Sequence, residues 1–180
     1  MVPNRKVPNR MVWGWSLLLL WLLTSVVVMF RFGQSEYGEF DPDLQLKQHP
    51  QQFSALSLLG NAEPGATVLI HVQDPNCRCT RLANQHLQAL AAQLATLPSL
   101  YQRTFHPAEL TALGIAVPAT PMLIVIRNQQ LVYSGPYASG PNCSVDDSLL
   151  AEIIAQKMHM PGVWLNSETA ACRCLTTTAS

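Results

Sequence analysis

Two identical triplets, Cys77-Arg78-Cys79 and Cys172-Arg173-Cys174, hold four of the five cysteines of this chain. The first triplet stands between a short apolar run, residues 67–72, and a long helical pattern that begins near Thr80. A thiol at a helix N-terminus meets the positive end of the helix dipole, which lowers the cysteine pKa from ~8.5 toward neutral. The sequence therefore predicts a reactive dithiol.

Thiol–disulfide exchange is the chemistry that such a dithiol performs. We expect Cys77 to attack as a thiolate and Cys79 to resolve the mixed disulfide. A bridge between thiols two residues apart requires the backbone to depart from helix, so it should be strained and oxidising. Arg78 and Arg81 either activate the thiolate or are solvated residues of the helix start. His71 either relays a proton to Cys79 or is a hydrogen-bonded core histidine.

The other three cysteines leave several pairings open, because an odd number cannot all pair within one molecule. Cys143 lies in a Gly-Pro-Asn loop, and a bridge from it to one tail thiol would attach the tail to the domain. Cys172 and Cys174 can instead bond to each other. In a further alternative, the tail triplet folds over the first triplet and serves as its relay.

Metal binding is the main rival function. Two Cys-x-Cys motifs supply up to four soft ligands, which suit Cu(I) or Zn(II). The spacing of one residue differs from the two to four that are typical of structural zinc, and no histidine closely neighbours either motif. We therefore expect no metal and no cofactor. A redox-inactive module that binds partners is the third alternative.

An N-terminal apolar segment separates a short tail from the rest of the chain. Residues 11–30 contain no charge and no proline, and about 20 apolar residues cross a bilayer as a helix. The preceding residues 1–10 carry Arg5, Lys6 and Arg10, so the positive-inside rule places them in the cytoplasm. The competing interpretation is a cleaved signal peptide. The formal net charge of zero gives no electrostatic argument for a nucleic-acid partner.

The remaining sequence predicts an α/β domain with a linker before it and a tail after it. Residues 31–49 are polar and indicate a tether, residues 50–160 form the domain, and residues 161–180 form a cysteine-containing tail that Trp164 would dock. Asp74 precedes a proline and indicates a turn or a helix cap. The expected elements are helices at 53–60, 80–97, 107–113 and from 146 to before 161, and strands at 67–72, 100–105, 122–126 and 131–133.

This order of elements, with a dithiol at the start of a helix and Thr120-Pro121 opening a late strand, resembles the thioredoxin fold over roughly residues 53–158. The resemblance implies a central mixed sheet flanked by helices, a cis Pro121, and a Thr120 backbone that binds the extended chain of a disulfide substrate. The family's Trp-Cys-Gly-Pro-Cys motif has two residues between its thiols, whereas this chain has one.

Asp74-Pro75-Asn76 before the first triplet, Tyr133-Ser-Gly-Pro-Tyr137, and the second Cys-x-Cys look like a group of bacterial membrane-anchored thioredoxin-like proteins. This resemblance implies a single-pass protein of the bacterial inner membrane whose domain faces the periplasm. Its expected partners are protein thiol or disulfide substrates and a redox partner.

Overall fold

The computed structural model describes residues 9–48, 63–155 and 162–176, and it divides into two compact units, Met1–Ser35 and Glu36–Ser180. Its elements, in chain order, are α1 Asn9–Ser35, β1 Tyr37–Glu39, α2 Gln45–Gln48, β2 Thr67–Val72, α4 Arg78–Ala89, α5 Ala91–Leu94, β3 Leu100–Phe105, α6 Pro107–Ala112, β4 Ala119–Thr120, β5 Met122–Arg127, β6 Gln130–Gly135, α7 Leu149–Ile154, β7 Trp164–Leu165, β8 Ala170–Cys172 and β9 Cys174–Leu175. The helix expected at 53–60 lies outside the described residues.

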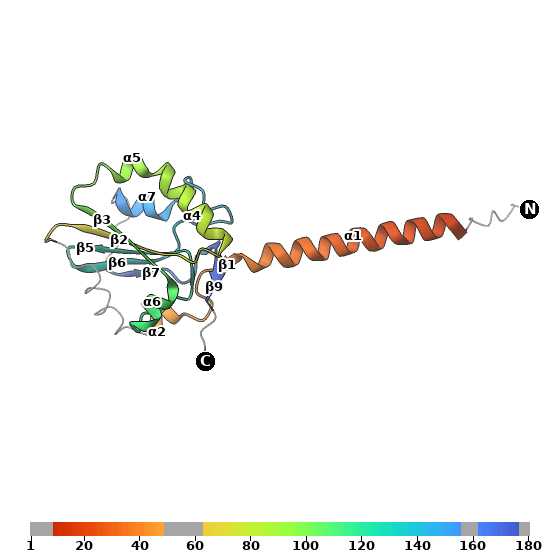
Figure 1. Cartoon of the computed structure of the whole chain (residues 1–180), viewed down its shortest axis with the longest axis horizontal. Coiled ribbons are helices and arrows are strands. Elements are labelled where there is room, and N and C mark those ends of the chain that lie inside the picture. Colours follow the sequence, from red (N-terminus) through yellow and green to blue (C-terminus); the bar gives the residue numbers. More distant parts are fainter. Residues whose placement is uncertain (1–8, 49–62, 156–161, 177–180) are drawn as a thin grey trace, which may run out of the picture. The chain divides into compact units, whose positions relative to one another are not determined.

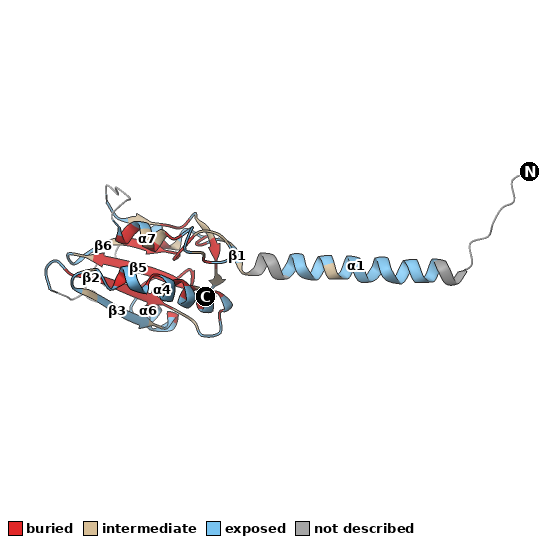
Figure 2. Cartoon of the chain, turned by 90° about the horizontal axis from the view of Figure 1, so that it is seen from above, coloured by how far each residue is buried: buried red, intermediate tan, exposed pale blue. Residues whose placement is uncertain are grey.

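Helix α1 forms the first unit. Its segment Val12–Arg31 is long and apolar enough to cross a membrane. Large apolar side chains along this segment are exposed, and Figure 2 shows this helix in the colour of exposed residues. Apolar side chains around the whole circumference of a helix are typical of a membrane span.

The second unit is a mixed α/β domain built on a five-stranded sheet with the order β3-β2-β5-β6-β7. Strands β2 and β3 are parallel, β2 pairs antiparallel with β5, β5 pairs antiparallel with β6, and β6 is parallel to β7. Every residue of β2 is buried, as its uninterrupted apolar sequence predicts. The predicted hairpin turns at Asn128 and Gln129, which both have positive φ.

Helices cover both faces of this sheet (Figure 1). On one face, α2 and α6 contribute Leu46 and Leu110 to a core that includes Ile70 and Ile124. On the other face, α4 and α7 contribute Ala83 and Leu150. Alternate residues of a strand point to opposite faces, so β2 and β5 supply side chains to both cores.

Helix ends agree with the prediction in some places and differ in others. Pro107 begins α6, and His106 and Glu109 form a reciprocal capping box with the backbone there. The expected helix 80–97 is divided at Leu90 into α4 and α5. The last helix begins after Ser148, whose hydroxyl accepts a hydrogen bond from the amide of Ala151. It does not begin at Asp146.

The prediction that residues 31–49 form a tether is wrong for residues 36–48, which belong to the domain. Phe40 and Leu46 are buried in the core. The carboxylate of Asp41 is 1 % exposed and accepts hydrogen bonds from the amides of Gln45 and Leu46 and from the hydroxyl of Ser167. The first amides of a helix have no acceptor within the helix, and Asp41 supplies acceptors for two amides of α2.

The residues expected to form an appended tail are also part of the domain. Strand β7 extends the main sheet, so Trp164 docks as expected, and its ring packs edge-on against Tyr133. Strand β8 pairs antiparallel with β1, and β9 pairs antiparallel with β4. The domain therefore includes strands from both sides of the predicted 50–160 range.

Candidate functional site

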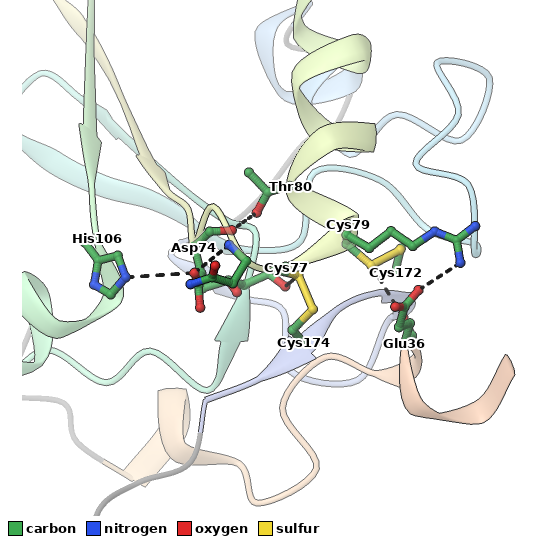
Figure 3. Close-up of a disulfide and its surroundings, with 11 residues drawn as sticks. Glu36, Asp74, Cys77, Cys79, Thr80, His106, Cys172 and Cys174 are labelled. Carbon is green, nitrogen blue, oxygen red and sulfur yellow. Dashed lines mark hydrogen bonds and ion pairs between the residues drawn. A yellow bond between two sulfur atoms is a disulfide. The ribbon is translucent and has the colours of Figure 1, made fainter. Parts of the chain in front are cut away.

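The two Cys-Arg-Cys triplets lie against each other and are joined by two disulfides (Figure 3). Cys77 bonds to Cys174, and Cys79 bonds to Cys172. The expected bridge between Cys77 and Cys79 is not formed, because each thiol faces a partner in the second triplet. The alternative in which the tail triplet folds over the first triplet is therefore the arrangement in the structure.

Two short antiparallel ladders hold the second triplet in this position. Cys172 pairs with Tyr37 across β1 and β8, while Cys174 pairs with Thr120 across β4 and β9. Between them, the amide of Arg173 donates to the carbonyl oxygen of Glu36 at 2.7 Å. Residues separated by one position in an extended chain point to the same side, so both cysteines face the first triplet.

The first triplet is positioned by the turn that follows β2. The Asp74 carboxylate accepts from the amide of Asn76 at 2.9 Å, and the Asp74 carbonyl accepts from the amide of Cys77 and the hydroxyl of Thr80. The turn predicted at Asp74 is thus confirmed. Cys77 is the N-cap of α4, and its extended backbone (φ −81°, ψ 123°) precedes the 12-residue helix. Cys79 lies in the first turn of that helix.

Thr120 and Pro121 lie next to the first triplet. The Sγ atom of Cys77 is 3.4 Å from the carbonyl oxygen of Thr120. This is a contact rather than a hydrogen bond, since a disulfide sulfur carries no proton. The peptide bond between Thr120 and Pro121 is cis, as the thioredoxin resemblance implies.

The four bonded cysteines differ in their access to solvent. Cys77, Cys79 and Cys172 are buried, whereas Cys174 is only partly buried. Cys174 also lines a cavity of about 640 Å³, with Asp74, His106, Thr120 and Leu175 among the other lining residues. The Cys77–Cys174 bridge, called the outer bridge below, therefore borders this cavity at Cys174, whereas the Cys79–Cys172 bridge, called the inner bridge, is buried.

His106 is a further residue of this cavity that was not predicted from the sequence. Its Nε2 lies 4.0 Å from the Asp74 carboxylate (Figure 3). Its Nδ1 accepts a hydrogen bond from the amide of Ala108, so Nε2 is the nitrogen that carries a proton. Its place just before Pro107 signals a helix start and gives no indication of a neighbouring cysteine.

The arginine inside each triplet has a different environment. Arg78 is exposed and forms an ion pair with Glu36 at 3.6 Å. Arg173 is partly buried, and its Nε is the only buried side-chain polar atom in the described part of the chain that lacks a hydrogen-bond partner. Burial lowers the pKa of Arg173, and the charge of Glu39 partly offsets this effect.

His71 lies in the core and uses both ring nitrogens. Nδ1 is 2.7 Å from the hydroxyl of Tyr137, and Nε2 is 3.0 Å from the side-chain oxygen of Gln102. Burial lowers the pKa of His71, and the hydrogen bond to Gln102 partly opposes this shift. These contacts are those of the hydrogen-bonded core histidine, and they leave neither nitrogen for a proton relay to Cys79.

Cys143 is a buried free thiol, so neither the alternative with a bridge from Cys143 to the tail nor the one with a Cys172–Cys174 bridge is the arrangement in the structure. Burial raises the pKa of this thiol to about 12, which keeps it protonated and unreactive. Its carbonyl oxygen is 2.9 Å from Nδ1 of His86, whose Nε2 is 2.9 Å from the hydroxyl of Ser148. The loop around Cys143 is thus fixed to α4 and α7, and both tail thiols bond elsewhere.

Comparison with known proteins identified one family. Residues 44–176 match the family model described as a domain of unknown function (DUF6436). No curated protein matched the sequence, and no solved structure matched it either. The matched range includes both Cys-Arg-Cys triplets and the strands β4, β8 and β9, whereas β1 lies before it. Because the match covers most of its length, the chain belongs to the DUF6436 family.

Proposed function

We propose that this protein is a membrane-anchored thiol–disulfide exchange protein with a thioredoxin-like domain. The observation that carries this proposal is the pairing of two Cys-Arg-Cys triplets into adjacent disulfides, one of which borders a cavity. Support for the thioredoxin resemblance comes from the mixed sheet with helices on both faces and from the contact between Cys77 and Thr120.

The outer bridge is the proposed point of entry. An incoming thiolate attacks Sγ of Cys174 from the cavity, and the bond to Cys77 breaks. Cys77 leaves with the electron pair as a thiolate at the N-cap of α4, where the amides of the first helical turn stabilise negative charge. The incoming thiolate belongs to a dithiol substrate, whose second thiol then attacks the mixed disulfide and releases Cys174 as a thiolate. The dithiol is oxidised, and one bridge is reduced.

The inner bridge supplies a second exchange step. The Sγ atoms of Cys77, Cys79 and Cys174 all lie within 4.8 Å of one another. The Cys77 thiolate can therefore attack Cys79, form a Cys77–Cys79 bridge and release the Cys172 thiolate. Electrons that enter at the outer bridge thus reach the inner one. In the reverse direction, reduced Cys77 attacks a substrate disulfide, and Cys174 replaces Cys79 as the resolving thiol.

Asp74 and His106 are the candidate proton donors and acceptors for the reacting sulfurs. Both side chains line the cavity that Cys174 borders. The thiolate released at Cys174 takes up a proton when the domain is reduced, and an imidazole or a carboxyl group in the same cavity can supply it.

Helix α1 is the proposed anchor. Its exposed apolar segment suits a lipid environment, and the basic residues before it favour a cytoplasmic N-terminus. The domain then faces the periplasm across a bacterial inner membrane. In that compartment its disulfides persist, and it meets protein thiols and disulfides together with a redox partner.

Glutathione disulfide tests this function with the reduced full-length chain in detergent micelles. The wild-type chain should form mixed disulfides only transiently and end with its two bridges restored. The double variant Cys79→Ser/Cys174→Ser should accumulate glutathione on Cys77, because both thiols close enough to resolve the mixed disulfide are missing, and mass spectrometry reads this product. Cys143→Ala is the matched control and should behave as wild type. Exchange with glutathione disulfide that is no faster than that of an unfolded peptide with the same cysteines would contradict this function. It would favour a redox-inactive binding module.

A further inference from the structure

Three of the four bonded sulfurs form a compact cluster, and the fourth is attached to it. The Sγ atoms of Cys77, Cys79 and Cys174 lie within 4.8 Å of one another, and that of Cys172 lies outside this group but is bonded to Cys79. Leu82 packs against these cysteines. Two independent bridges would not require their sulfurs to lie so close together.

The backbone keeps these sulfurs together when the bridges are open. The ladders between β1 and β8 and between β4 and β9 pair Cys172 and Cys174 with Tyr37 and Thr120. Additional bonds run from the amide of Cys172 to Gly140 at 3.0 Å and from the amide of Thr176 to Pro118 at 3.0 Å. Reduction of the disulfides breaks none of these bonds.

Four thiolates at such positions match the requirements of a tetrahedral metal. Zn²⁺ binds sulfur at about 2.3 Å, which places the sulfurs of a Cys₄ site about 3.8 Å apart. Bonded sulfurs lie about 2 Å apart, so each has to withdraw from its partner by about 1 Å. Rotation about the Cα–Cβ bonds provides such shifts. The single-residue spacing within each triplet is no obstacle, because the two triplets face each other.

The charges around the cluster also suit a metal thiolate. Four thiolates and one Zn²⁺ carry a net charge of −2, and each triplet contributes one arginine, Arg78 or Arg173. These two guanidinium charges offset the excess negative charge only at longer range, since Arg78 also pairs with Glu36 and the Arg173 guanidinium lies over Gly38.

We propose that the reduced domain binds one Zn²⁺ through Cys77, Cys79, Cys172 and Cys174. A dithiol reductant supplies two electrons and two protons to each disulfide, which yields four thiols. Binding of Zn²⁺ then releases their protons to solvent. The disulfide form and the metal form exclude each other, because the same four sulfurs make either two S–S bonds or four S–Zn bonds.

Titration of the full-length chain with Co²⁺ and Zn²⁺ tests this site. The chain is kept in detergent micelles, reduced with a phosphine and handled without oxygen. Co²⁺ should produce the intense visible and near-ultraviolet absorption of a tetrahedral tetrathiolate, saturating at one ion per chain, and Zn²⁺ should displace it. The oxidised chain should bind neither ion. Absence of these bands, or equal binding by the oxidised chain, would overturn the proposal.

Cysteine variants distinguish a site with four sulfur ligands from a site with fewer ligands. Each of Cys77→Ser, Cys79→Ser, Cys172→Ser and Cys174→Ser should weaken Zn²⁺ binding by about tenfold or more, since even residues that only orient ligands contribute that much. Cys143→Ala should bind as wild type. Unchanged affinity in Cys172→Ser or Cys174→Ser contradicts the four-sulfur site.

Differential alkylation provides a readout that does not depend on the variants. Zn²⁺ should protect the cysteines of both triplets in the folded wild-type chain, and circular dichroism should show the same secondary structure with and without the ion. Alkylation of the second triplet at an unchanged rate contradicts the site. Exchange with glutathione disulfide is measured separately in the presence of a chelator, so the two proposals can fail independently.

Discussion

Thr120 and Cys174 face each other across the antiparallel ladder of β4 and β9, and Cys174 is bonded at the same time to Cys77. The residue before the cis proline, the N-cap thiol of α4 and the second triplet are thereby joined in one place. Backbone pairing holds the thiol of Cys174 in front of Cys77, so the effective concentration of the two thiols is high and reoxidation should be fast.

A non-reducing peptide map should recover Cys77 linked to Cys174 and Cys79 linked to Cys172, with Cys143 as a free thiol. Because Arg78 separates Cys77 from Cys79, trypsin can cleave between them and also after Arg173, so the two bridges separate into different peptides. Alkylation of Cys143 should require denaturant, since that side chain is buried. Recovery of a Cys77–Cys79 bridge in the resting protein would falsify the pairing.

Loosening of β9 should accelerate reduction of the outer bridge. Thr176→Pro removes the amide that donates to Pro118, while a proline after Leu175 remains compatible with the extended strand. Loss of one such hydrogen bond corresponds to roughly 2- to 10-fold more frequent opening. Quenched alkylation should show faster reduction of the Cys77–Cys174 bridge by that factor.

The matched control for this change is Thr176→Ala. It keeps the amide and loses the hydroxyl, which donates to the carbonyl of Val117. The bridge between Cys79 and Cys172 should change less in either variant, because the β1–β8 ladder holds it. Equal acceleration of both bridges by Thr176→Pro contradicts a role of β9 in holding only the outer one.

Asp41→Ala should destabilise the domain by about 2–3 kcal/mol, because two amides of α2 and the hydroxyl of Ser167 lose their buried acceptor. Urea unfolding followed by circular dichroism measures the change. Asp43→Ala, at an exposed position two residues later, should change the unfolding free energy by less than about 0.5 kcal/mol. Equal effects of both variants would indicate that residues 36–48 contribute nothing to the fold.

Stability should fall as the pH falls below neutral. Burial lowers the pKa of His71 below its ordinary value of 6.5, so the unfolded chain binds a proton more readily than the folded one. This contribution is fully present above pH ~6.5 and is lost as the pH falls from there through the lower pKa of the folded state. Urea unfolding at a series of pH values between about 5 and 8 measures the slope.

The variant His71→Gln should flatten part of this slope, because glutamine does not titrate. The remaining slope comes from His86, whose pKa is also lowered by burial. A steeper slope in His71→Gln than in the wild-type chain contradicts a neutral histidine in the folded core.

Much of the fold could be predicted from periodicity and from turn residues. The strands 67–72 and 100–105 have the predicted bounds, and the hairpin after Met122 follows the predicted order. These elements are continuous in sequence and uniformly apolar or bounded by Pro and Gly, so local patterns are sufficient to locate them.

The strands β1, β8 and β9 could not be predicted, because they have only two or three residues and polar neighbours. A run of this length has no measurable periodicity, and its stability comes from a partner far away in the chain. Phe40 and Leu46 were the available signals, as apolar residues in an otherwise polar segment. Composition alone led to the interpretation of this segment as a tether.

The candidate site was predicted in its residue types but not in its pairing. The identical triplets indicate that both take part in one chemistry, and Thr120 and Pro121 are found beside Cys77. Connectivity depends on which sulfurs the tertiary fold brings together, and several pairings satisfy the same sequence. His106 lies near Asp74 and Arg173 lies near Gly38, and a single sequence does not reveal such neighbours from distant elements.

The bridges span 97 and 93 positions of the chain, and this spacing imposes a delay on biosynthesis. At ribosomal rates of about 5–20 residues per second, the first triplet waits roughly 5 to 20 seconds before its partners have been made. During that interval its sulfurs are open to premature oxidation with each other or with foreign thiols. Maturation of this domain therefore depends on protecting or repairing the first triplet until the second triplet and its strands have been made.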